Sequence, residues 1–249
     1  MQLKNKNMVV IGGSRGVGRA IVEAAQAEGA CVLAVGRRAD SLAQLSDELP
    51  GARTLQADAT NEDTPGKVFE AMMPDVLVLC GGAIPPMGPV QDLSWEEFSM
   101  NWNNDVKSSF EFCRAALRLP LRPGSTVVLI SSGAAIGGSG ASGGYAGAKK
   151  MQMFMADYCQ AESKRGNLGL RFVSLAPMRI MRDTDLGKVA IEGYAHWLGM
   201  SEADFIARME DAAPTPEDVV RAVVDFAVSA HTKEGTSFGV SSSGVAPLS

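Results

Sequence analysis

A glycine-rich stretch near the start of the chain constrains its fold most strongly. Met8 to Ile11 is a short apolar run, Gly12-Gly13-Ser14-Arg15-Gly16-Val17-Gly18 follows directly, and a helical pattern then continues to Gly29. In a strand–loop–helix unit of this kind, glycines let the backbone approach a pyrophosphate, and the helix N-terminus offers free N–H groups. We therefore expect a dinucleotide site that comprises Gly12, Ser14, Arg15, Gly16, Val17 and Gly18. The alternative is a tight turn without a ligand.

Similar apolar runs alternate with helical patterns along the rest of the chain. Strands are expected at 8–11, 31–35, 53–57, 76–80, 127–130, 170–175 and 236–241, and helices at 19–29, 40–49, 94–119, from 145 onward and at 217–230. Strand–helix alternation predicts a doubly wound parallel sheet with helices on both faces, in three α/β/α layers. We predict one Rossmann-type domain over residues 1–249, with 178–213 as a mobile lid, a small-residue loop at 133–144 and a loop at the tail.

Composition narrows the function classes. The 249 residues suit a single α/β domain, and a net charge of −5 argues against nucleic-acid or anionic-membrane partners. No apolar run reaches membrane-spanning length, and the N-terminus lacks a signal-peptide core. Four scattered cysteines indicate reduced thiols in a cytoplasmic protein. With only two histidines and no metal-ligand spacing, neither a metal centre nor a Ser-His-Asp triad is expected.

The end of the second predicted strand indicates which dinucleotide binds. An NAD-preferring site would place Asp or Glu about 20 residues past the glycine loop. Gly36, Arg37 and Arg38 stand there instead, and Arg15 is close by in such a fold. Because a guanidinium suits a 2′-phosphate, we expect NADP(H) in preference to NAD(H). The alternative is a pair of solvated surface arginines.

Two more strand ends contribute candidate cofactor contacts. Asp58, followed by Ala59, could accept a hydrogen bond from an adenine amino group or cap the next helix. Gly81-Gly82 can pass close to a cofactor ribose, since neither residue carries a side chain.

The stretch from Val127 to Lys149 carries the candidate catalytic residues. Ser132 follows a buried-strand run, and Tyr145 and Lys149 are spaced to share one helix face. A free tyrosine, with a pKa near ~10, is a poor acid or base at neutral pH, and a neighbouring ammonium favours its phenolate. Tyr-x-x-x-Lys alone is a weak signal, and an exposed Tyr and Lys on an ordinary helix is the alternative.

Taken together, these motifs resemble the short-chain dehydrogenase/reductase family in its compact form. The resemblance covers nearly the whole chain and rests on Gly12-x-x-x-Gly16-x-Gly18, Asp58, Gly81-Gly82, Ser132, Tyr145-x-x-x-Lys149 and Pro177. It implies that Tyr145 is the general acid in carbonyl reduction and the base in alcohol oxidation. It also implies that Ser132 orients the substrate oxygen, that Lys149 holds the nicotinamide ribose, and that Pro177 lies in the cofactor site. Hydride transfer from the 4-pro-S face is a further implication.

Four positions depart from the family pattern. Leu79-Cys80 precedes the glycine pair where Asn-Asn is usual, Met178 follows Pro177 where Gly is usual, and Ser241-Ser242-Ser243-Gly244 replaces an Asp-Gly-Gly. The asparagine that anchors a proton-relay water is Asp105 here, although a one-residue shift would select Asn104. These departures leave open a catalytically retired dinucleotide-binding regulatory or scaffold protein.

The leading hypothesis is an NADP(H)-dependent enzyme that interconverts a ketone and a secondary alcohol, with Ser132, Tyr145, Lys149 and Asp105 as its catalytic set. Apolar residues of the lid favour an apolar or aromatic ketone, unless they only pack the lid: Tyr194, Trp197, Leu198, Met200, Phe205 and Met209. Arg179, Arg182 and Lys188 could instead meet a carboxylate or phosphate. The family also implies a homodimer or homotetramer through the 94–119 helix and the Tyr145 helix.

Overall fold

The computed structural model describes residues 1–209 and 213–248, and its centre is one sheet of eight strands. In chain order the strands are β1 (Asn7–Ile11), β2 (Cys31–Gly36), β3 (Arg53–Gln56), β4 (Val76–Leu79), β5 (Thr126–Ile130), β6 (Arg171–Pro177), β7 (Ser237–Ser241) and β8 (Gly244–Pro247). Their order across the sheet is β3-β2-β1-β4-β5-β6-β7-β8. All neighbours pair parallel except β7 and β8, so the predicted doubly wound sheet is confirmed up to its last strand.

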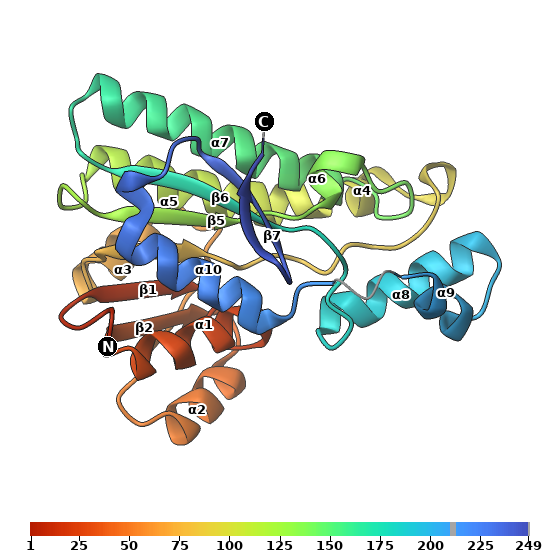
Figure 1. The fold of residues 1–249 in the computed structure, drawn as a ribbon, viewed down its shortest axis with the longest axis horizontal. Helices are drawn as coiled ribbons and strands as arrows, with labels where there is room; N and C mark the ends of the chain where they lie inside the picture. Colours follow the sequence, from red (N-terminus) through yellow and green to blue (C-terminus); the bar gives the residue numbers. More distant parts are fainter. Residues whose placement is uncertain (210–212, 249) are drawn as a thin grey trace.

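Helices cover both faces of this sheet (Figure 1). They are α1 (Gly16–Ala27), α2 (Ala39–Glu48), α3 (Thr64–Ala71), α4 (Trp95–Asn101), α5 (Lys107–Arg118), α6 (Ala134–Gly137), α7 (Tyr145–Arg165), α8 (Asp185–Leu198), α9 (Glu202–Arg208) and α10 (Pro216–Ser229). One core cluster joins the sheet to α1, α2 and α10, and a second joins it to α3, α5 and α7. Side chains of adjacent strand residues point to opposite faces of the sheet and so belong to different clusters. Val9, for example, lies in the second cluster and Val10 in the first.

The predicted 94–119 helix contains a turn that its pattern does not reveal. Ser94 and Glu97 form the expected capping box. Beyond Asn101, however, residues Trp102–Val106 form one π-helical segment before α5 begins. Such segments are rare and often occur at functional sites, because the extra residue reorients the side chains of that turn. This one carries the candidate residue Asp105.

Two expected loops were wrong. The tail forms β8, whose Gly244–Pro247 backbone pairs antiparallel with β7, because Gly244 at φ 119° allows the tight reversal. Within 133–144, Ala134–Gly137 forms the short helix α6.

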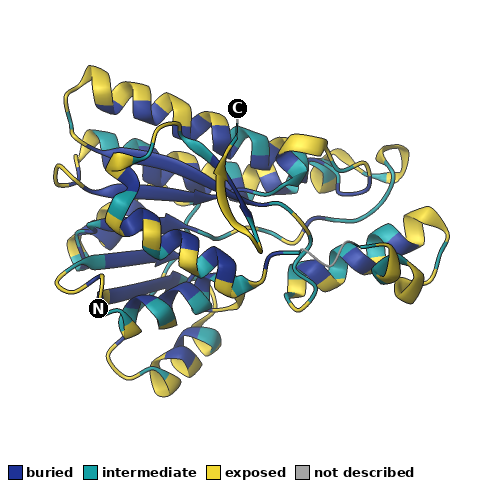
Figure 2. Cartoon of the chain, viewed as in Figure 1, coloured by how far each residue is buried: buried dark blue, intermediate teal, exposed yellow. Residues whose placement is uncertain are grey.

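The expected lid is helical where it is described. Its segment 178–213 contains α8 and α9, while residues 210–212 lie outside the described residues. Figure 2 shows buried strands at the centre and, beside them, helices α8 and α9, in which exposed and intermediate residues outnumber buried ones.

Candidate active site

The candidate site lies at the carboxyl ends of the strands, where the sheet changes winding direction. The chain runs from β1 outward to β2 and β3, then returns to add β4 on the other side of β1. Ligands of open α/β sheets bind at such a switch point. A cavity of about 800 Å³ opens here, lined by the glycine loop, by the ends of β2 to β6 and by α8 and α9.

The glycine loop has the shape and the donors of a phosphate site. A Cβ on Gly12 would lie 2.6 Å from the Gly81 backbone, and one on Gly18 would lie 2.1 Å from the Gly12 carbonyl oxygen. Gly16, at φ +53°, faces open space. No side chain caps the N-terminus of α1, so its first N–H groups remain available to a ligand. These features fit the pyrophosphate of a dinucleotide.

The arginines expected near a 2′-phosphate line the cavity together with Arg15. Arg37 donates to the Asn104 amide oxygen at 3.4 Å. Arg38 pairs with Asp40 at 2.7 Å, and this guanidinium lowers the pKa of the exposed Asp40 to about 2. The sequence reading missed the Asp40 partner. Arg38 therefore has to share its donors between Asp40 and any phosphate.

Asp58 and Ala59 also line the cavity, beside Gly81 and Gly82. Oδ1 of Asp58 accepts from the backbone N–H of Thr60 at 2.9 Å and from its hydroxyl at 2.8 Å. These bonds, the backbone one first, lower the pKa of Asp58. The alternative that Asp58 caps the next helix was wrong, because the N-cap residue of α3 is Asp63.

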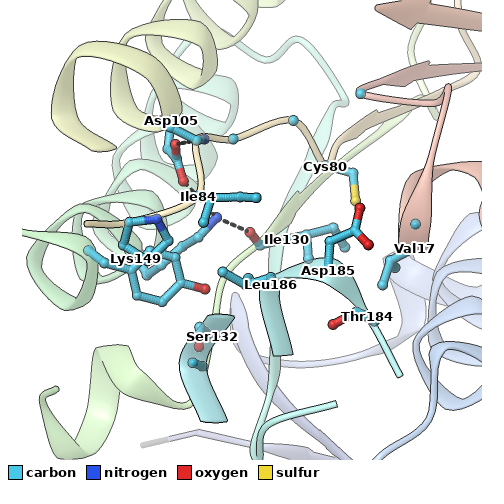
Figure 3. Close-up of a pocket in the computed structure, with 18 of the residues that line it drawn as sticks. Val17, Cys80, Ile84, Asp105, Ile130, Ser132, Lys149, Thr184, Asp185 and Leu186 are labelled. Carbon is cyan, nitrogen blue, oxygen red and sulfur yellow. Dashed lines mark hydrogen bonds and ion pairs between the residues drawn. The ribbon is translucent and has the colours of Figure 1, made fainter. Parts of the chain in front are cut away.

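Ser132, Tyr145 and Lys149 all line this cavity. Figure 3 shows Ser132 and Lys149 within it. Ser132 lies two residues after the end of β5, and Tyr145 is the first residue of α7. The Lys149 ammonium lies 5.6 Å from the centroid of the tyrosine ring. The preceding Ser131 faces away from this group, since its hydroxyl donates to the Lys149 carbonyl.

Lys149 is buried and holds two partners. Its Nζ donates to the Ile130 carbonyl at 3.1 Å and lies 3.2 Å from Oδ2 of Asp105. Burial alone would lower the pKa of Lys149, but the charges of Asp105 and Tyr145 outweigh it, and the pKa is raised. An ammonium has three N–H groups, so one remains for a ligand such as a ribose hydroxyl.

Asp105, rather than Asn104, faces Lys149. Its Oδ1 accepts from the Ala83 N–H at 2.9 Å and from the Asn101 amide at 3.3 Å. Asn104 instead donates to the Met100 carbonyl at 2.9 Å. The π-helical turn sets this orientation, which helical periodicity could not predict.

Residues after β6 complete the cavity. Pro177, Met178 and Thr184 line it, and Thr184 also N-caps α8. Asp185 and Leu186 were not singled out from the sequence, yet both line the cavity, and Asp185 lies on the side of Cys80 and Val17 (Figure 3). A capping threonine predicts where a helix starts, but not which way its first turn faces.

Of the three cations expected near the lid, only Arg179 lines the cavity, whereas Arg182 and Lys188 do not. The described part of the chain holds no cluster of three His, Cys, Asp or Glu side chains suited to a metal ion. Across residues 1–209 and 213–248, no helix is long and apolar enough to cross a membrane.

A comparison with models of known protein families shows which family the chain belongs to. Residues 6–193 match the family model described as short chain dehydrogenase. The chain belongs to the short-chain dehydrogenase/reductase family. Membership implies a nicotinamide cofactor.

Curated relatives of this short-chain dehydrogenase/reductase are distant. L-xylulose reductase of Mesocricetus auratus is 27% identical over 129 residues, which cover 52% of this chain and 53% of the relative. Carbonyl reductase [NADPH] 2 of Sus scrofa is 28% identical over 134 residues, 53% of this chain and 55% of the relative. 7beta-hydroxysteroid dehydrogenase of Mediterraneibacter gnavus is 25% identical over 178 residues, 67% of this chain and 66% of the relative. The chain therefore spans about half to two thirds of the length of these relatives.

Solved structures match the fold over nearly the whole chain. A short-chain dehydrogenase/reductase, glucose/ribitol dehydrogenase, from Brucella melitensis superposes with a TM-score of 0.75 at 20% identity, covering 95% of this chain and 94% of that one. A short chain dehydrogenase/reductase family protein gives 0.74 at 22% identity, with 95% of each chain covered. At such identities the match supports the fold alone.

Proposed function

We propose that this protein is an NADP(H)-dependent oxidoreductase that interconverts a ketone and a secondary alcohol. The observation that carries the proposal is the meeting of Ser132, Tyr145 and Lys149 in the same cavity as the glycine loop. A bound nicotinamide cofactor supplies the hydride that the carbonyl carbon accepts. Arg15, Arg37 and Arg38 favour the phosphorylated form of that cofactor.

The protein's own groups handle the proton and the oxygen. Tyr145 gives its phenolic proton to the carbonyl oxygen as the C–O double bond becomes a single bond. Ser132 donates a hydrogen bond to the same oxygen and fixes its position. Lys149 favours the resulting phenolate by its charge, and its remaining N–H is available to the cofactor ribose. Alcohol oxidation runs the same steps in reverse.

Asp105 has a positioning role in this proposal. Its carboxylate pairs with the Lys149 ammonium and also accepts from the backbone N–H of Ala83, so it links that lysine to the loop after β4. It thereby takes the place that the family pattern gives to an asparagine. The same substitution motivates the rival proposal, a protein that binds the dinucleotide without turning it over.

Binding and turnover assays separate the two functions. NADPH and NADH are titrated into the purified protein, and NADPH absorbance is then followed with a panel of ketones. The oxidoreductase proposal expects tighter NADPH than NADH binding together with oxidation of NADPH by at least one ketone. Tight binding without turnover across the panel, unchanged when Asp105 is replaced by Asn, would favour the retired protein.

We also propose a homo-oligomer that assembles through α4, α5 and α7. Large apolar side chains on these helices and on the π-helical turn between α4 and α5 are between 42% and 78% exposed: Trp95, Trp102, Phe110, Phe154 and Tyr158. Covering such a surface stabilises an assembly. Light scattering on the eluted protein should show a dimer or tetramer, and Phe154→Asp should shift it toward the monomer. A monomeric wild-type protein would contradict this.

A further inference from the structure

Beyond Tyr145 the cavity continues to α8 and α9, and there its wall is aromatic. Tyr194 and Trp197 of α8 and Phe205 of α9 line it. The rings of Tyr194 and Phe205 stack with centroids 5.8 Å apart and planes 6° from parallel. Trp197 meets Tyr194 edge-on at 6.3 Å. Tyr194 thus packs against both of the other rings, and the three form an apolar wall.

Glycines let this wall approach the loops opposite. A Cβ on Gly193 would lie 2.5 Å from the Cβ of Met87, so only glycine allows α8 to pack there. A Cβ on Gly140 would lie 3.4 Å from the Trp197 ring, which places this ring over the 139–142 loop. The aromatic wall is therefore held against two loops of the main domain.

The cavity lining leaves apolar side chains partly uncovered. Trp197 and Leu198 are 46% and 48% exposed, and Ile84 is 38% exposed. All three line the cavity. Because removing apolar area from water is favourable, a bulky apolar ligand gains affinity by covering them.

A chain of hydroxyl groups interrupts this apolar surface at one point. The Ser139 hydroxyl contacts both the Tyr194 and the Ser142 hydroxyls, and all three residues line the cavity. Three hydroxyl groups carry three hydrogens, but the two contacts between them use only two. One donor is left to meet an acceptor on a ligand.

Charged lining residues lie elsewhere. Arg15, Arg37, Arg38 and Asp58 belong to the cofactor end, Asp105 and Lys149 pair with each other, and Arg179 follows β6. Asp185 is the first residue of α8 and lies on the side of Cys80 and Val17 (Figure 3). The other residues of α8 and α9 that line the cavity are uncharged. A charged group of a ligand on the aromatic wall would find no partner there, which favours an uncharged ligand.

We propose that α8, α9 and the 139–142 loop form a substrate subsite for a bulky, uncharged ring ketone that carries a second oxygen remote from its carbonyl. The rings of the substrate lie on Tyr194, Trp197 and Phe205, and its remote oxygen accepts the spare hydrogen of the Ser139–Tyr194 hydroxyl pair. This inference rests on the proposed oxidoreductase function and names its substrate class.

Equilibrium binding tests the subsite without turnover. The bicyclic ketone 2-decalone, its analogue 6-hydroxy-2-decalone and pyruvate are titrated by calorimetry into the protein saturated with NADP⁺. The hydroxyl analogue should bind about fivefold to tenfold more tightly than 2-decalone, which is what one net hydrogen bond contributes. Pyruvate should bind most weakly.

Variants separate the contribution of the hydroxyl pair from that of the aromatic wall. Either single variant, Tyr194→Phe or Ser139→Ala, still leaves the hydroxyl of the other residue free to donate. The double variant Tyr194→Phe/Ser139→Ala should therefore remove the advantage of the hydroxyl analogue and leave 2-decalone binding unchanged, because Ser142 can still donate to the backbone carbonyl of residue 139. Trp197→Ala should weaken both bicyclic ketones about tenfold. Val228→Ala is the control, because Val228 is 52% exposed on α10 and lies outside both the cavity lining and the proposed oligomer surface.

Equal binding of the two decalones to the wild-type protein, or tighter binding of pyruvate, would overturn the proposal. Turnover with NADPH is measured separately on the same ketones. Reduction of small ketones without binding of the bicyclic ones would contradict the proposed subsite but support the oxidoreductase function. Binding of the bicyclic ketones without turnover of any ketone would contradict the proposed function but support the subsite.

Discussion

The Asp105 carboxylate lies 3.2 Å from the Lys149 ammonium, and both side chains are at least nine-tenths buried. A lysine that shares its charge with a carboxylate attracts a nearby phenolate less than an unpaired lysine does. Asp105 therefore reduces the electrostatic stabilisation that Lys149 gives to a phenolate at Tyr145, while it keeps Lys149 itself protonated.

The first prediction concerns the pH dependence of Asp105→Asn. The raised pKa of Lys149 depends on Asp105 and Tyr145 acting against burial, so loss of Asp105 should lower the pKa of Lys149. The limb of the pH–rate profile for alcohol oxidation that reports loss of the Lys149 proton should therefore move to lower pH. The control is Asp92→Asn, which removes the charge of an exposed carboxylate. An unshifted profile for Asp105→Asn would show that the Asp105 charge does not affect the pKa of Lys149.

The second prediction concerns the phenolic hydroxyl of Tyr145. Tyr145→Phe keeps the ring but removes the proton donor, so kcat should fall by about 10²–10⁴ while NADPH binding is unchanged. Tyr158→Phe changes an exposed tyrosine on the same helix and should leave kcat unaltered. Full activity of Tyr145→Phe on an established substrate would falsify the proposed acid.

The third prediction concerns the choice of cofactor. Replacing Arg37 and Arg38 together by Ala should raise the Kd of NADPH about tenfold or more, because charge-assisted hydrogen bonds contribute about 1.5–3 kcal/mol each. The Kd of NADH should stay the same, since NADH has no 2′-phosphate. Arg53→Ala, at the opposite end of β3, serves as the control. If the Kd values of NADPH and NADH rise by the same factor, the two arginines do not contact the 2′-phosphate.

The fourth prediction uses two neighbouring glycines as a matched pair. A Cβ on Gly82 would lie 2.7 Å from Oδ2 of Asp105, whereas the nearest atoms to a Cβ on Gly81 are 3.7 Å away. Gly82→Ala must displace the buried carboxylate from Lys149, so its free energy of unfolding should fall by about 1–3 kcal/mol. Gly81→Ala should be close to wild type. Urea unfolding measures both, and equal midpoints would contradict the packing seen at Asp105.

The fifth prediction concerns thiol reactivity. Burial raises the pKa of the Cys80 thiol to about 11, although Cys80 lines the cavity. Cys113 and Cys159 are buried, and Cys31 is exposed. Iodoacetamide at neutral pH should therefore alkylate Cys31 first, as peptide mass spectrometry would show, because only the thiolate reacts. Rapid alkylation of Cys80 would mean that its sulfur is not held in an apolar setting.

Local patterns in the sequence determined much of this protein. The glycine loop between strand and helix, the alternation that builds the parallel sheet, and the Ser94–Glu97 capping box each involve residues close together in the chain. Their physical causes, backbone freedom, hydrophobic periodicity and unsatisfied N–H groups, act over a few residues. They can therefore be identified without the tertiary structure.

Only the tertiary structure decided the features that depend on how distant segments pack. The π-helical turn selects Asp105 over Asn104 because that turn packs against α7. Asp40 engages Arg38, and the Tyr194 hydroxyl meets Ser139, 55 residues earlier in the chain. No local periodicity encodes such contacts, since side-chain direction at an irregular turn, and the meeting of distant loops, follow from the packing of the whole domain.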